Sequence, residues 1–290
     1  MPSLKEYKNK LKSLHNTRKM TKTMKMVAAS KLYKTMDAQR KATVYATKLH
    51  DMIAKLAASV DPTAHALLQG REEPKTALVI VVTSDKGMCG GFNNNLIKYV
   101  TRWMERPPKL YDRIDLSFIG RRGLLAFRNR AQMKANYDGV TQKPTYGHAV
   151  KIANEAIESF LSGEYDEVYI AYNHFINPLS QKPMMNFLLP IEHHEIRVAD
   201  KGVASNFILE PAESELLSVL LPKTVEFEIY YALLENAAGE NGARMTAMDN
   251  ATNNANAMID LYTLLRNRAR QASITKELIE IISGAEALKG

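Results

Sequence analysis

The chain is 290 residues long, with 46% hydrophobic and 24% charged residues, so it can bury a core in one large or two modest domains. Its formal net charge of +8 indicates an acidic partner: nucleic acid, lipid headgroups or an acidic protein surface. A single cysteine excludes an internal disulfide framework and favours a reducing compartment. The sequence has neither an apolar run long enough to cross a bilayer nor a secretory signal pattern, so we expect a soluble, cytoplasmic protein.

The first 60 residues predict one long helix. No glycine or proline interrupts residues 3–60, and Pro62 provides a stop. At ~1.5 Å per residue this helix would be roughly 85 Å long, and its stripe of apolar and small side chains needs a partner helix. The stripe repeats every seven residues at Tyr7, Leu14, Thr21, Ala28, Thr35, Ala42, Leu49 and Leu56.

Charge on this helix is one-sided, because up to position 36 its basic residues are opposed by Glu6 alone. Any single lysine is explained equally well by a solvated helix face. A sustained run is different, because like charges at helical spacing repel one another, and it indicates an acidic surface nearby. The basic residues are Lys5, Lys8, Lys10, Lys12, Arg18, Lys19, Lys22, Lys25, Lys31 and Lys34.

The middle of the chain, about residues 75–205, alternates between strand and helix patterns. Residues 76–83 form a nearly continuous β-branched run, which is typical of a strand covered on both faces. The alternation predicts a small Rossmann-like α/β domain with a largely parallel sheet. Further strands are expected at 114–119 and 167–172, helices at 92–105 and about 148–161, and antiparallel strands at 184–189 and 192–198.

The glycine-rich loop at residues 84–91 is the strongest candidate for a small-molecule site, because it follows a strand and precedes a helix. It matches neither GxxxxGK[ST] nor GxGxxG, so a tight turn with close backbone contact to a partner is the favoured interpretation. Cys89 in this loop is expected to be a packed small residue, since no histidine and acid can be assigned to it. We therefore predict no catalytic residue, no metal and no cofactor.

The last third of the chain, about residues 216–288, predicts a second long helix with an alternating four- and three-residue seam. Its economical partner is the first helix, in an antiparallel coiled coil. Uncharged polar residues occupy its other faces at 250–256, and a more apolar line follows an arginine cluster near the end. The seam is Arg244, Met248, Ala251, Ala255, Met258, Tyr262, Leu265, Ala269 and Ala272.

The predicted fold class is therefore α/β, with two long terminal helices that form an antiparallel coiled coil and an inserted Rossmann-like domain. The expected division is an N-terminal helix at 1–60, the α/β domain at 75–205 and a C-terminal helix at 210–290. The second helix pairs with the first.

Three motifs in the expected order resemble the gamma subunit of F-type ATP synthases, of bacterial type. Residues 20–31 (MTKTMKMVAASK) resemble its amino-terminal motif, and residues 84–93 (SDKGMCGGFN) its central loop. Residues 269–285 (ARQASITKELIEIISGA) resemble its carboxy-terminal signature. The resemblance covers the whole chain.

The resemblance implies a non-catalytic central-stalk rotor that transmits torque between a membrane ring of c subunits, driven by proton flow, and the catalytic beta subunits. The coiled coil would lie inside a ring of alpha and beta subunits, with the α/β domain and the epsilon subunit on the c ring. The implied location is the cytoplasmic face of the bacterial inner membrane, peripheral through the c ring, or alternatively the matrix face of the mitochondrial inner membrane.

The resemblance also implies contact residues. Met24 matches a residue that faces an acidic lever loop of beta, with Lys25 and its neighbours supplying the complementary charge. Arg270 and Gln271 match contacts to a catch loop of beta. Lys86 stands where many relatives have arginine, which preserves the charge but loses a bidentate fork. The apolar end, at Ile274, Leu278, Ile281 and Leu288, would fit a hydrophobic bearing.

Two other functions are compatible with parts of the sequence. A nucleic-acid-binding coiled coil would use the basic first helix, and its binding would fall steeply with salt. A nucleotide-binding enzyme would be centred on Gly87, although the loop lacks the phosphate-binding motifs.

Overall fold

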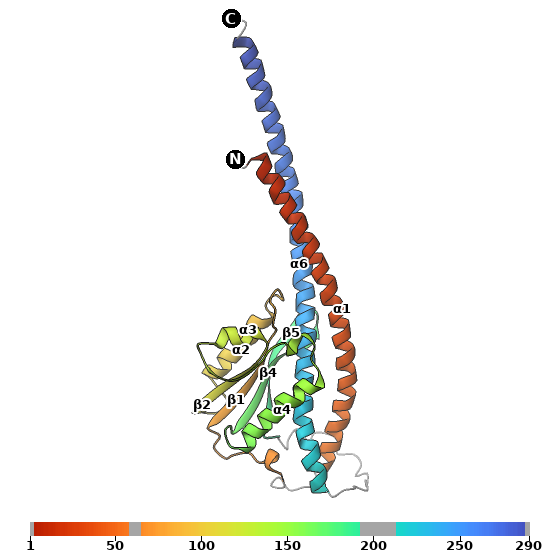
Figure 1. Cartoon of the computed structure of the whole chain (residues 1–290), viewed down its shortest axis with the longest axis vertical. Helices are drawn as coiled ribbons and strands as arrows, with labels where there is room; N and C mark the ends of the chain where they lie inside the picture. The colour runs from red at the N-terminus through yellow and green to blue at the C-terminus, as the bar shows by residue number, and fades with distance from the viewer. Residues whose placement is uncertain (1–2, 58–64, 192–212, 288–290) are drawn as a thin grey trace. The chain divides into compact units, whose positions relative to one another are not determined.

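The computed structural model describes residues 3–57, 65–191 and 213–287, and it divides into two compact units (Figure 1). One unit contains residues 1–28 and 245–290, and the other contains residues 29–244. Two long helices, α1 (Leu4–Ala57) and α6 (Glu213–Ala287), contribute to both units.

The larger unit contains a five-stranded sheet with the strand order β3-β2-β1-β4-β5. The first four strands are parallel, and β5 is antiparallel to β4. The order of the parallel strands is that of a Rossmann-like half-domain. The strands are β1 (Thr76–Val82), β2 (Arg113–Ile119), β3 (Gln132–Tyr137), β4 (Glu167–Asn177) and β5 (Ser180–Leu189).

Helices cover both faces of this sheet, which explains why β1 is apolar along nearly its whole length. On one face, α2 (Phe92–Glu105) and α3 (Arg121–Phe127) bury Leu96, Val100 and Phe127 against β1 and β2. On the other face, α4 (Tyr146–Leu161) and α6 pack against β1 and β4. Two short 3₁₀ turns complete the unit, at Ala66–Leu68 and Val140–Gln142.

Two glycines let α6 approach the sheet closely. A Cβ on Gly239 would lie 2.9 Å from Cε2 of Phe92, and a Cβ on Gly242 would lie 3.0 Å from Cα of Pro178. Glycine inside a helix costs roughly 0.5–1 kcal/mol relative to alanine. Glycine is nevertheless required at these two positions, because no larger residue fits between α6, the start of α2 and the β4–β5 hairpin.

The smaller unit is an antiparallel pair formed by the start of α1 and the second half of α6 (Figure 1). Its seam is narrow, with Ala28, Ala255 and Thr21 buried alongside Leu11 and Met248. The cross-contacts run in opposite directions along the two helices, as an antiparallel pair requires. They are Lys25 to Asp249, Thr21 to Thr252, Arg18 to Asn256 and Tyr7 to Tyr262.

The predicted fold is confirmed, including the helix at 92–105 and the strands at 76–83, 114–119 and 184–189. Two elements were not predicted: α3, which is short and contains a glycine, and β3, a polar edge strand whose first half is exposed. The expected strand at 192–198 and residues 58–60 lie outside the described residues. The three-part domain division stays a prediction.

The C-terminal seam was predicted incorrectly at two positions. Met258 is 48% exposed, and its neighbour Ile259 is buried instead, because the buried stripe of a real helix drifts away from a strict 3.5-residue repeat. Ala272 is also exposed, because α1 begins at Leu4 and does not extend beside that part of α6.

Replacing Gly239 with alanine is expected to lower the free energy of unfolding by about 1–3 kcal/mol, the usual range for overpacking. Gly147→Ala is the matched control, because a Cβ there meets nothing closer than Thr145 Oγ1 at 4.0 Å. The control should be neutral or slightly stabilising. Urea unfolding followed by circular dichroism measures both, and equal midpoints would contradict the close-approach explanation.

Candidate functional site

The C-terminal end of α6 extends past the start of α1, where no other described element of the chain lies beside it (Figure 1). Every residue from Arg270 to Glu286 is exposed, a length of roughly 25 Å at ~1.5 Å per residue. Arg270 and Gln271, predicted as contact residues, lie at the beginning of this free segment. A helical segment without packing contacts is poorly stable in water, so contact with another molecule would stabilise it.

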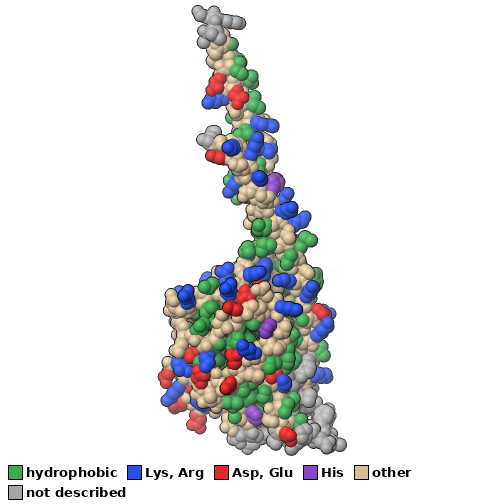
Figure 2. All heavy atoms as spheres, viewed as in Figure 1, with side chains coloured by type: hydrophobic (Ala, Val, Ile, Leu, Met, Phe, Trp, Pro, Cys, Tyr) green, Lys and Arg blue, Asp and Glu red, His purple; other side chains and the backbone are tan. Residues whose placement is uncertain are grey.

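This free segment is unusually apolar for an exposed surface. Figure 2 shows hydrophobic side chains on α6 near its C-terminal end. Ile274, Leu278 and Ile281 follow helical spacing and are 49%, 53% and 67% exposed, with Ile279 and Ile282 beside them. Contiguous exposed apolar surface of this kind marks an interaction site. Leu288, the fourth predicted residue of this line, lies outside the described residues.

The lysines of α1 are largely exposed along the helix (Figure 2). Lys25 is an exception, because its Nζ lies 2.6 Å from Oδ1 of Asp249 on α6, with both side chains about 40% exposed. Met24 is half-buried beside this ion pair. The predicted pair of contact residues therefore lies at the edge of the seam, rather than on the fully solvated face.

The exposed apolar side chains of this part of α1 are Met20 and Met26, at 64% and 65%, together with Val27. Neither methionine packs into the buried seam between the two helices. Met20 precedes Thr21 by one residue and Met26 precedes Ala28 by two, so the seven-residue stripe already indicates that both methionines lie on another face of the helix.

The glycine-rich loop after β1 uses its polar groups to hold itself together. The Oγ of Ser84 donates to the carbonyl of Lys86 at 2.6 Å, and the backbone N of Ser84 donates to Oδ1 of Asn93 at 2.9 Å. Asn93 also donates to Sγ of Cys89 at 3.2 Å. Cys89 is buried, which raises the pKa of its thiol, while Lys86 is exposed. The loop is a packed turn, as its sequence indicated.

Helix α6 occupies the crevice in which Rossmann-like folds bind nucleotides, at the carboxyl ends of β1 and β4. Asn236 donates to the carbonyl of Thr83, and Nη2 of Arg244 donates to the carbonyls of Lys86 and Gly87 at 3.3 and 3.2 Å. The same Nη2 lies 2.6 Å from Oε1 of Glu240. Burial raises the pKa of Glu240, an effect that Arg244 opposes. These contacts hold α6 against the backbone carbonyls at the end of β1 and in the loop that follows it.

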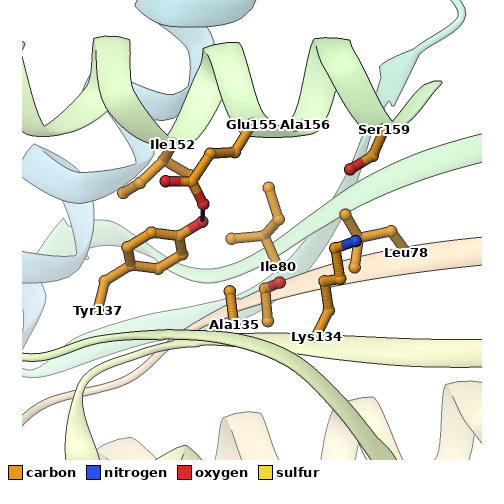
Figure 3. A pocket seen from close by; sticks show the side chains of 10 residues that line it. Leu78, Ile80, Lys134, Ala135, Tyr137, Ile152, Glu155, Ala156 and Ser159 are labelled. Atoms are coloured by element: carbon orange, nitrogen blue, oxygen red, sulfur yellow. Dashed lines mark hydrogen bonds between the residues drawn. The ribbon is translucent and has the colours of Figure 1, made fainter. Parts of the chain in front are cut away.

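A small cavity lies between β3 and α4, lined by Lys134, Tyr137, Ile152, Glu155 and Ser159 among others (Figure 3). It holds about 20 Å³, which is room for roughly one water molecule. The hydroxyl of Tyr137 donates to Glu155 across it, so these two polar side chains already pair with each other. The cavity is too small for a nucleotide or another cofactor.

Within residues 3–57, 65–191 and 213–287, no group of three or more His, Cys, Asp and Glu side chains is arranged to hold a metal ion. No helix in these same ranges combines the length and the apolarity that a bilayer-crossing segment needs.

Comparison with known proteins gives matches along the whole chain. Residues 3–288 match the sequence model of the family described as ATP synthase. The chain is 44% identical to the ATP synthase gamma chain of Trichlorobacter lovleyi and 44% identical to that of Geobacter metallireducens, with 100% of each chain covered.

Solved structures give the same fold. The chain resembles a subunit of the central stalk and c ring of Tetrahymena thermophila mitochondrial ATP synthase, with a TM-score of 0.57, 25% identity, and 80% of this chain and 99% of that chain covered. A chain of the Euglena gracilis mitochondrial enzyme has a TM-score of 0.67 at 20% identity, with 98% and 94% covered, and supports the fold alone.

Cys89 is expected to react with iodoacetamide far more slowly in the folded chain than in urea. Its burial limits access, and its raised pKa lowers the thiolate fraction, so the rate should increase only above the ordinary titration range of a thiol near pH 8.5. Mass spectrometry of timed samples gives both rates. Equal rates with and without urea would show that the loop does not enclose the thiol.

Proposed function

Because the chain belongs to the ATP synthase gamma chain family, we propose that its coiled coil and its α/β unit contact different partners within that complex. The chain is a non-catalytic subunit, and its function is that of the central-stalk rotor. The observation that supports the proposal most strongly is the apolar end of α6, from Arg270 to Glu286, which none of the described residues covers.

For this free end, the proposed partner is the ring of alpha and beta subunits. A rotating helix tip needs a collar that attracts it without fixing its angle, and apolar contact is suitable because it is non-directional. Arg270 and Gln271 lie at the base of the tip, where directional contacts to a beta loop would be made. Ile274, Leu278, Ile281 and Leu288 would form the bearing.

For the basic side of α1, the proposed partner is an acidic loop of beta. Up to residue 36 the exposed lysines have almost no acidic residue of their own helix to pair with. Met24 and Lys25 would lie at the edge of this contact, with Lys25 shared between beta and Asp249. Exposed Met20 and Met26 would supply adaptable apolar contact beside the charges. Lys86 is proposed as a further contact to beta.

For the α/β unit, the proposed partners are the epsilon subunit and the c ring, and torque would enter the chain there. The proposed location is the cytoplasmic face of the bacterial inner membrane, with the chain held through the c ring. The nucleic-acid alternative receives no support from the relatives.

Replacing Ile274, Leu278 and Ile281 together with glutamine is expected to weaken retention of the chain by the alpha–beta ring. Each side chain should contribute about 1 kcal/mol through burial, so the loss should be easily measured. Retention is read from the gamma chain that remains after dilution and gel filtration of the assembled complex.

The matched control replaces Lys276 and Glu280 with glutamine, because this exposed pair, 3.5 Å apart, lies within the same turns. The control should behave like the wild type. Equal retention of all three complexes would contradict the bearing proposal.

The purified chain alone is expected to show no ATP hydrolysis, because α6 fills the crevice at which this fold would bind a nucleotide. Phosphate release is measured with the chain free of beta subunit. Turnover that follows the chain through successive purification steps would contradict this expectation.

A further inference from the structure

Glu235 on α6 is a fully buried carboxylate, with 0% of its surface exposed. It lies in the larger unit, where α6 passes both α1 and the sheet. Burying a carboxylate is costly unless hydrogen bonds and charges compensate for the lost water. Its partners therefore indicate what the residue does.

Those partners come from two other elements, so that Glu235 links three. Its Oε1 accepts a hydrogen bond from Nε2 of Gln39 on α1. Its Oε2 accepts a hydrogen bond of 2.5 Å from the backbone N of Phe175 on β4 and lies 2.9 Å from Nδ1 of His174.

Tyr231 and Tyr172 are the other titratable groups close to the Glu235 carboxylate, and Glu228 lies near both tyrosines. Burial, followed by the charge of Glu235, raises the pKa of the Tyr231 hydroxyl to about 12, so this group stays protonated and able to donate. The pKa of Tyr172 is also raised, by burial first and then by Glu228 and Glu235. The carboxylate is thus surrounded mainly by donors.

The apolar contacts of α6 with the sheet cannot replace this arrangement. Leu233, Ala232 and Ile229 join the buried cluster on that face of the sheet and oppose separation of the two layers. Hydrophobic contact is non-directional, however, and permits a helix to slide or rotate slightly on the surface that it covers. Hydrogen bonds to a buried charge are directional and short, so they define both register and rotation.

We propose that Glu235 is a positioning residue that fixes the rotational setting of α1 and α6 relative to β4, so that torque reaching the sheet is passed to both helices together. This inference rests on the rotor function proposed above. It goes further by assigning the internal coupling of the chain to one side chain and its two-sided contacts, rather than to the coiled coil as a whole.

The test uses a charge swap within the assembled complex. Gln39→Glu places a second carboxyl group against Glu235 and removes the hydrogen bond from α1 to Oε1 of Glu235. The double variant Gln39→Glu, Glu235→Gln restores it, because the new amide on α6 can donate to the new carboxylate on α1 and still accept from the N of Phe175. Lys41→Gln is the control, since it makes the same change in charge on an exposed site of α1.

ATP hydrolysis and ATP-driven proton uptake are measured on the same vesicles containing the complete ATP synthase, normalised to the gamma chain incorporated. We expect hydrolysis by Q39E to stay close to that of the wild type, with proton uptake per ATP reduced roughly threefold or more, within the range of a typical coupling change. The double variant and K41Q should both return the wild-type ratio.

A merely structural role would lower hydrolysis and uptake in proportion and leave their ratio unchanged, which would overturn the proposal. So would a double variant that stays uncoupled. If Q39E is not incorporated, Gln39→Leu gives the same measurement without repulsion, and a wild-type ratio for it would also overturn the proposal. Failure of the rotor function itself would look different, because complexes that lack the chain would then pump protons as well as complete wild-type complexes do.

Discussion

The antiparallel pairing of α1 and α6 is the interaction on which the other features depend. Neither helix could persist in water at such a length by itself, so each needs the other along its buried stripe. The stripe in the smaller unit is built from alanines and threonines as well as larger residues, so the two backbones can approach closely. A narrow seam leaves most of each helix surface facing outward. Because the seam is narrow, the lysines and methionines of α1 and the asparagines of α6 remain exposed outside it.

Helix α6 also determines what the α/β unit cannot do. The sheet has the strand order and the crevice of a nucleotide-binding fold, yet Asn236, Glu240 and Arg244 occupy the end of that crevice. The loop after β1 then closes on itself through Ser84 and Asn93. A fold known for binding small molecules is thereby used as a support for a helix, which illustrates why function must be argued from the site rather than from the architecture.

The sequence predicted those parts of the structure that depend on periodicity. The seven-residue stripe through Thr21 and Ala28 and the β-branched run of β1 follow directly from burial. Elements stabilised mainly by their neighbours, such as β3 with its exposed first half, gave no such pattern. The burial of Glu235 could not be predicted for a related reason. A glutamate in a long helix is normally expected to be exposed to solvent, and this one is buried only because β4 and α1 pack against it.

The distribution of charge shows why the basic character of the chain is concentrated on α1. Six carboxylates among the described residues are buried, all of them in the larger unit. Most have a basic partner close by, as Asp166 has Arg71 and Glu240 has Arg244. Each of these buried acids is offset by a neighbouring base, which in most pairs is itself partly exposed, so the pairs add little net charge to the surface. The excess positive charge therefore lies on the first helix, where the lysines have few acidic partners among the described residues, in agreement with the proposed contact to an acidic surface of another subunit.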